Sequence, residues 1–229
     1  MKTIAIVPAA GLGVRMGKKE PKQFLSLKGR PILQWTLQAL EASPLVEGIC
    51  LVVSPDRVEK MRQDLLEESL KVQWVVAGGK ERQDSVRNGF REIPVCDLVL
   101  VHDAVRPLVP QKLIESLIEK ASETGAAIPG LPVKETLKEG SDKNEVVRTV
   151  DRKKFWSIQT PQVFRYEVFQ EAVDRSEKDS FLGTDEAMLV ERIGKKVSLV
   201  TGSPYNLKIT TPEDLVVAEG LIDANRNRL

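Results

Sequence analysis

Short apolar runs alternate with amphipathic stretches along the first half of the chain. The apolar runs cover residues 3–7, 48–53, 72–76 and 98–101, and each is nearly continuous, which is typical of strands buried on both faces. Helical spacing of apolar residues predicts helices over these ranges: 31–42, 56–66, 84–90 and 110–124. Buried strands that alternate with helices predict an α/β fold with a Rossmann-like, mostly parallel sheet flanked by helices.

The second half of the chain has a less regular pattern. Residues 132–138 and 146–150 alternate like strands around a charged, turn-rich segment, which predicts a projecting hairpin. We expect helices near 166–176 and 184–193, a strand over 196–200, and a last helix that begins at Thr211. Since no repeat or linker interrupts the pattern, we expect one domain over residues 1–229, with a β-arm at about 133–152.

Composition excludes several classes of protein. The 34 Lys and Arg residues against 33 Asp and Glu residues leave a net charge of +1, which argues against a nucleic-acid or polybasic membrane surface. Two cysteines without a paired spacing and a single histidine exclude a disulfide scaffold and a multi-histidine metal site. No apolar stretch approaches the roughly 20 residues of a membrane helix. We therefore expect a soluble protein of the reducing cytoplasm, with no membrane or nucleic-acid partner.

A glycine-rich segment at 8–17 follows the first predicted strand directly. Small residues there let backbone N–H groups approach a polyphosphate, although glycines alone predict a tight turn equally well. The spacing excludes a dinucleotide fingerprint because Met16 stands where the third glycine is needed, and the chain has no P-loop. Arg15 and Lys22 add cations beside the loop, which favours a triphosphate ligand.

Further motifs follow this loop in a fixed order over nearly the whole chain. They are AAGLGVRM at 9–16, PKQ at 21–23, GGKERQDSV at 78–86, HDAVRP at 102–107, TVDR at 149–152, QTPQ at 159–162, TDEA at 184–187 and NLKIT at 206–210. The ordered set resembles the 2-C-methyl-D-erythritol 4-phosphate cytidylyltransferases, a family of nucleotidyltransferases. The resemblance implies transfer of CMP from CTP to 2-C-methyl-D-erythritol 4-phosphate, with release of pyrophosphate, in the non-mevalonate route to isoprenoid precursors. A relative that uses another polyol phosphate, such as ribitol 5-phosphate, is the alternative.

The resemblance also implies residue roles. Arg15 and Lys22 would stabilise the transition state, and Arg152 and Lys208 would position the substrate's phosphate. Asp103, which follows a predicted buried strand, would ligate Mg²⁺ or another divalent ion. Nucleotide contacts are expected from Ala9, Ala10, Gly11, Gly79 and Ser85, and substrate contacts from Arg106, Thr136, Thr160 and Thr184.

Two further expectations follow from the resemblance. The arm would form a homodimer with shared active sites, in which Arg152 reaches the neighbouring subunit. Pro204 and Tyr205 stand where some relatives carry an acid, so metal binding would depend on Asp103, the CTP phosphates and water. Thr136, Thr160 and Thr184 could instead serve as ordinary turn and cap residues, and Thr184 in particular could cap its helix.

Overall fold

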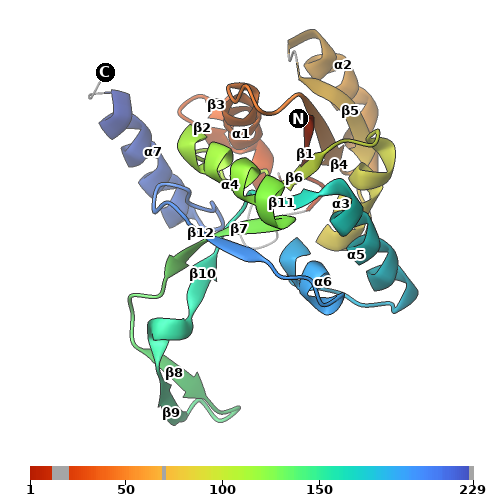
Figure 1. Ribbon diagram of the computed structural model, residues 1–229. Helices are drawn as coiled ribbons and strands as arrows, with labels where there is room; N and C mark the ends of the chain where they lie inside the picture. The colour runs from red at the N-terminus through yellow and green to blue at the C-terminus, as the bar shows by residue number, and fades with distance from the viewer. Residues whose placement is uncertain (12–20, 69–70, 227–229) are drawn as a thin grey trace.

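The protein is described by a computed structural model that covers residues 1–11, 21–68 and 71–226 (Figure 1). The main sheet contains β1 (Thr3–Pro8), β4 (Gly48–Val53), β5 (Val72–Ala77), β6 (Leu98–Val101), β7 (Ala126–Pro132), β10 (Trp156–Ile158), β11 (Gln162–Arg165) and β12 (Ser198–Thr201). Within the described residues its strand order is β10-β7-β11-β6-β1-β4-β5, and β12 pairs with β7. Strands β6, β1, β4 and β5 are parallel neighbours, whereas β11 runs antiparallel to both β6 and β7. The predicted mostly parallel sheet is confirmed.

Helices cover both faces of the sheet. They are α1 (Ile32–Glu41), α2 (Val58–Glu68), α3 (Arg82–Glu92), α4 (Gln111–Thr124), α5 (Tyr166–Lys178), α6 (Glu186–Arg192) and α7 (Pro212–Arg226). Alternate residues of β1 face opposite layers, because successive strand side chains point to opposite sides. Ala5 belongs to the apolar cluster under α1, α2 and α4, whereas Ile6 belongs to the cluster under α3, α5 and α6. These two layers bury the strands on both sides, as their continuous apolar sequence requires.

A third apolar cluster joins the C-terminal helix to the segment after the glycine loop. Ile222 of α7 packs with Leu27 of β2 (Ser26–Leu27) and with Val105, just beyond β6. Strand β2 pairs with β3 (Arg30–Pro31), which leads into α1. A main-chain hydrogen bond from Ile209 N to Val105 O, 2.9 Å long, ties the segment before α7 to the loop after β6.

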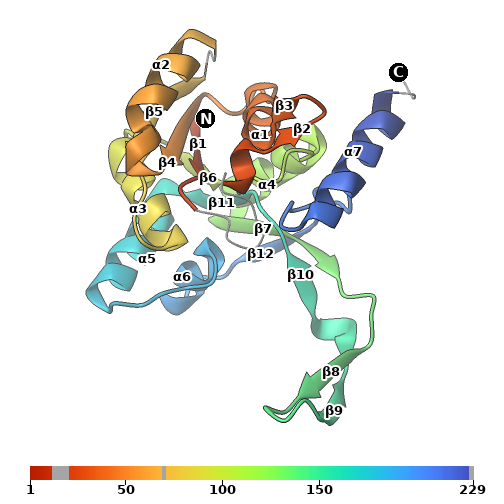
Figure 2. The ribbon, with the colours of Figure 1, turned by 180° about the vertical axis from the view of Figure 1, so that it is seen from behind.

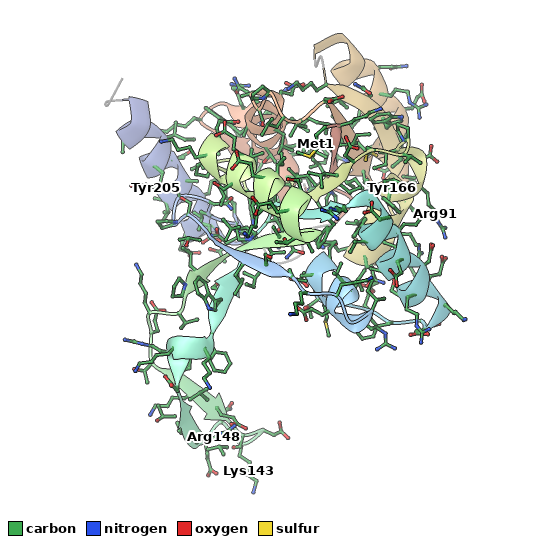
Figure 3. All side chains as sticks on the ribbon, in the orientation of Figure 1. Met1, Arg91, Lys143, Arg148, Tyr166 and Tyr205 are labelled. Carbon is green, nitrogen blue, oxygen red and sulfur yellow. The ribbon has the colours of Figure 1, made fainter. Side chains whose placement is uncertain are left out.

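A two-stranded arm projects from this body (Figures 1 and 2). It consists of β8 (Leu137–Gly140) and β9 (Val146–Val150), paired antiparallel, and the chain returns to the sheet through the short helix η4 (Arg152–Lys154) and β10. Figure 3 shows Lys143 and Arg148 near the far end of the arm. The predicted hairpin is therefore confirmed.

The strand predicted over 132–138 is wrong at its centre, because residues 133–136 are irregular and the regular structure lies on either side of them. The structure instead places β7 at Ala126–Pro132, which the apolar pattern did not indicate. Its sequence AAIPGLP is poor in β-branched and aromatic residues, so its strand propensity is low. The strand forms because neighbouring strands bond to both of its edges, with β12 on one edge and β10 and β11 on the other.

No described helix is long and apolar enough to cross a bilayer.

Gly89 of α3 allows the close approach of this helix to the sheet. A Cβ at this position would lie 2.8 Å from Val52 Cγ2 and 2.9 Å from Ile6 Cγ2, whereas a Cβ on Gly220 of α7 would meet nothing within 4 Å. We expect Gly89→Ala to destabilise the protein, because overpacking costs about 1–3 kcal/mol and exceeds the gain of roughly 1 kcal/mol in helix propensity.

Gly220→Ala is the matched control, because it makes the same change in a helix without the collision. It should stabilise the protein by up to about 1 kcal/mol. Urea unfolding of the two variants measures both effects, and equal stabilities would contradict this account of the packing of α3.

Candidate active site

A cavity of about 690 Å³ opens at the carboxyl-terminal edge of the parallel strands, where open α/β sheets place their ligands. Its walls come from the loops after β1, β4, β5 and β6 and from the segment before α7. The described lining residues are Pro8, Ala9, Ala10, Gly11, Lys22, Gln23, Ser54, Pro55, Gly79, Lys80, Glu81, Arg82, Ser85, Asp103, Ala104, Val105 and Lys208. Every predicted nucleotide contact, together with Lys22, Asp103 and Lys208, therefore lies on one cavity. Arg15 lies outside the described residues.

Gln23 holds the beginning of the glycine loop. Its buried amide Nε2 donates to Ala9 O at 2.5 Å and to Gly11 O at 3.0 Å, while Ala9 N donates to Val52 O at 2.6 Å. The carbonyl and the following N–H of a trans peptide point in opposite directions. Because the Ala9 carbonyl faces Gln23, the Ala10 N–H points away from Gln23.

The second glycine segment packs tightly against the first. A Cβ on Gly78 would lie 2.3 Å from the Cβ of Ala10, so only glycine fits there. Ser85 is buried, and its hydroxyl accepts a hydrogen bond from Gly79 N and donates one to Glu81 O, both 3.2 Å long. Ser85 thus fixes the backbone of the loop before α3 and keeps Gly79 at the cavity.

Asp103 is the centre of a charged cluster at the end of β6. Its carboxylate accepts from Arg82 Nε at 3.2 Å, from Lys208 Nζ at 2.9 Å and from Arg106 Nε at 3.3 Å. Arg82 also pairs with both oxygens of buried Glu186, at 2.6 and 3.0 Å. Three cations and two carboxylates leave the cluster with one excess positive charge. A cavity wall of this charge favours an anionic ligand.

The cations control the ionisation of Asp103. Burial alone would raise the pKa of this carboxyl group, but the positive charges of Arg82, Lys208 and Arg106 hold it well below the usual range. Asp103 is therefore a carboxylate at any physiological pH.

The predicted substrate contacts do not line the cavity within the described residues of one chain. Arg106 lies behind Asp103, where its Nη1 also donates to Asn206 O at 2.8 Å. Thr160 is buried, and its hydroxyl accepts from Asp103 N at 3.0 Å. Thr136 is exposed between β7 and β8. Arg152 is exposed on η4 and donates from Nη1 to Lys134 O.

Thr184 is also exposed, and the capping alternative for it is wrong. The N-cap of α6 is Asp185, whose Oδ1 accepts from Met188 N at 2.9 Å. Thr184 instead contacts the sulfur of Met188.

Three buried or half-buried residues support the site without having been assigned a role from sequence. They are Gln23, Arg82 and Glu186, and each falls inside a motif that carried the resemblance. Glu186 lies 104 residues from Arg82 in the chain, so only the fold brings the two together. The one signal in the sequence that could have pointed to these three residues was their position inside the family motifs.

The cavity fits a divalent ion that is held mainly by a ligand's phosphates. Among the described residues no group of three or more acidic, histidine or cysteine side chains gathers in one place, so the protein alone does not build a metal cage there. Asp103 supplies one ionised carboxylate on the wall. A single carboxylate together with phosphate and water oxygens is a common set of Mg²⁺ ligands.

Known proteins are similar to this chain in sequence and in structure. The sequence model of the 2-C-methyl-D-erythritol 4-phosphate cytidylyltransferase family matches residues 3–224. A protein of that name from Syntrophus aciditrophicus is 42% identical, and the match covers 100% of this chain and 99% of the relative. Another from Geobacter metallireducens is 44% identical, with 97% and 98% covered. A crystal structure of a protein of the same name from Thermus thermophilus matches with a TM-score of 0.80 and 35% identity, covering 96% of this chain and 98% of the other.

The contacts of Gln23 predict a loss of nucleotide affinity when its amide is removed. We expect Gln23→Leu to weaken CTP binding about tenfold, because two carbonyls of the glycine loop lose their donor. Calorimetric titration of CTP with Mg²⁺ into the variant and the unmodified protein measures the change.

Gln111→Leu is the matched control. Gln111 likewise donates from its amide to a main-chain carbonyl, Ala39 O at 2.6 Å, but this contact joins α4 to α1 and not the cavity. Its loss should leave CTP affinity unchanged. Equal weakening in the two variants would contradict a specific role for Gln23.

Proposed function

The chain belongs to the 2-C-methyl-D-erythritol 4-phosphate cytidylyltransferase family, and we propose that the cavity between the glycine loop and Asp103 is where it works. The enzyme transfers the CMP moiety of CTP to 2-C-methyl-D-erythritol 4-phosphate and releases pyrophosphate. The observation that carries the placement is the net positive cluster around Asp103, which faces the glycine loop across one cavity.

The reaction needs charge stabilisation more than it needs a base. A phosphate oxygen of the polyol phosphate forms a bond to the α-phosphorus of CTP, and the bond from that phosphorus to the β-phosphate oxygen breaks. The attacking oxygen is already ionised at neutral pH, so no side chain has to remove a proton. Negative charge then accumulates on the phosphoryl oxygens, where preorganised cations lower the barrier.

The cavity's cations divide between the two substrates in this proposal. Lys22 follows the glycine loop and would stabilise the α-phosphoryl group and the leaving pyrophosphate, together with Arg15. Lys208 contacts Asp103 from the other wall and would position the phosphate of the acceptor. Backbone amides at Ala10 and Gly11 would hold the triphosphate, while Gly79 and Ser85 would lie near the nucleoside.

A divalent ion, Mg²⁺ in the first instance, would enter with CTP and be held by Asp103, the phosphates and water. It would neutralise phosphate charge and orient the α-phosphoryl group. Asp103 suits this role because it is ionised and reaches the cavity wall. Its contact with Lys208 would keep the carboxylate oriented until the nucleotide enters.

The arm supports a homodimer with shared active sites. Val146 and Val147 of β9 are 65% and 60% exposed, and Phe155, where the chain returns to the sheet, is 46% exposed. A second copy of the chain would cover them. Pairing of this kind would also explain why Arg152 and Thr136 lie away from the cavity of their own chain, since each would enter the cavity of the partner.

We also propose that the enzyme acts in the cytoplasm. Its two cysteines, Cys50 and Cys96, are free thiols, which suits a reducing compartment. Nucleoside triphosphate and sugar phosphate substrates are consistent with that location.

Substrate choice is tested by pyrophosphate release with CTP and Mg²⁺, with 2-C-methyl-D-erythritol 4-phosphate and ribitol 5-phosphate offered in parallel. We expect rapid release with the first acceptor only. Release with ribitol 5-phosphate alone would show that ribitol 5-phosphate is the acceptor instead.

Lys208→Met should lower kcat/KM by about a hundredfold or more, as the loss of other electrostatic catalytic groups does. Lys120→Met, which changes an exposed lysine on α4, is the control and should keep full activity.

The shared site predicts complementation between two inactive variants. Arg152→Met and Lys208→Met should each be inactive alone, whereas a mixed dimer has one complete cavity and one that carries both changes. Co-expression of the two should therefore restore about a quarter of the unmodified activity, assuming random pairing of subunits. Inactive mixed dimers, verified by two different affinity tags, would place Arg152 and Lys208 of the same chain on one cavity and contradict the shared site, whereas an active Arg152→Met variant would exclude Arg152 from the site.

A further inference from the structure

His102, the single histidine of the chain, lies behind the cavity. It is fully buried directly after β6, and its backbone N–H extends the pairing with β1 by donating to Ile6 O at 3.0 Å. Both ring nitrogens have partners. Nε2 lies 3.1 Å from Arg106 O, and Nδ1 lies 3.1 Å from the hydroxyl oxygen of Thr160.

The chemistry of these partners determines which nitrogen carries the proton. A carbonyl oxygen can only accept, so Nε2 must be protonated to bond with Arg106 O. The ring is fully buried, and each ring nitrogen contacts an uncharged group, so nothing at the ring offsets the cost of burying a second proton and its charge. The ring is therefore neutral, and Nδ1 is unprotonated. Nδ1 therefore accepts, and Thr160 donates its hydroxyl proton to it.

The hydroxyl of Thr160 is oriented by this donation. With its proton directed at His102, its lone pairs are available to the Asp103 N–H, which lies 3.0 Å away. The chain of hydrogen bonds thus runs in one direction, from Asp103 N–H to Thr160, from Thr160 to His102, and from His102 to Arg106 O.

Asn206 joins the same arrangement to the opposite wall of the cavity. Its side-chain Nδ2 donates to Thr160 O at 2.7 Å, and its main-chain oxygen accepts from Arg106 Nη1 at 2.8 Å. Lys208, two residues later, bonds to Asp103. The segments at 102–106, 159–161 and 206–208 are therefore linked around the carboxylate.

We propose that His102 is a positioning residue: as the neutral Nε2–H tautomer it orients the Thr160 hydroxyl, which holds the backbone of Asp103 and so directs the carboxylate into the cavity. Thr160 then acts through Asp103 and does not need to touch the substrate. The inference rests on the proposed function only in that Asp103 acts in this cavity.

The tautomer is tested on the unmodified full-length protein, without nucleotide, by ¹⁵N NMR with labelled histidine at neutral pH. Since the chain has one histidine, a single pair of ring nitrogens is observed. We expect Nδ1 to resonate as an unprotonated, pyridine-like nitrogen and Nε2 as a protonated, pyrrole-like one. A protonated Nδ1 would overturn the inference. Because this readout does not depend on turnover, it is separate from the test of the proposed function.

Thr160→Val and Thr160→Ser test the effect on catalysis. Removing the hydroxyl should lower kcat by about ten- to hundredfold at saturating concentrations of both substrates, as the loss of other outer-shell partners does. The ring-nitrogen signals of the substrate-free variant should change as well, because Nδ1 loses its donor. The serine variant, which keeps a hydroxyl, should restore most of the activity and the original signals.

Thr3→Val is the matched control. Thr3 is a fully buried threonine on β1 whose hydroxyl has no hydrogen-bond partner in the described part of the chain. Its substitution should leave kcat and the histidine signals unchanged. A substrate contact by Thr160 would instead raise the KM for the acceptor while the free protein kept its histidine signals, and that result, or an unchanged kcat in Thr160→Val, would overturn the proposed positioning.

Discussion

A buried carboxylate loses its hydration, and Asp103 is stable at the end of β6 because three cations replace that water. This requirement organises the surrounding structure. Arg82 approaches from α3 and is itself paired with Glu186 of α6, Arg106 approaches from the loop after β6, and Lys208 approaches from the segment before α7. Four parts of the chain that are distant in sequence thus meet at one charge. The same arrangement leaves a positive surface where a triphosphate can lie.

The rest of the cavity is built from backbone held in place by side chains. Gln23 binds carbonyls of the glycine loop, Ser85 binds the loop before α3, and Thr160 binds the main chain of Asp103. Each of these residues is buried, so the bonds do not compete with water. Prearranged amides and charges need little reorganisation when a phosphate ligand enters, which is the physical basis of electrostatic catalysis.

Two residues predicted to act on the acceptor side do not line the cavity of their own chain, and in the proposed dimer the arm would bring them to the partner's cavity. Arg152 and Thr136 lie on or beside a hairpin that extends away from the body (Figure 2). Strand β10 connects this hairpin to β11 through residues 159–161, the segment that carries Thr160.

Sequence alone determined the elements whose signals are local. The strands at 48–53 and 98–101 were predicted with their observed ends because continuous apolar runs mark fully buried strands. The ordered motifs identified the family. The residues that they predict to contact the nucleotide all line one cavity, because they lie in short segments at the ends of strands. Strand β7 was missed, since AAIPGLP has little intrinsic strand preference and becomes a strand only through bonds to β10, β11 and β12. Likewise, only the tertiary structure brought Glu186 to Arg82 and turned Thr160 toward His102, because hydrogen bonds between residues 58 to 104 positions apart leave no periodic trace in the chain.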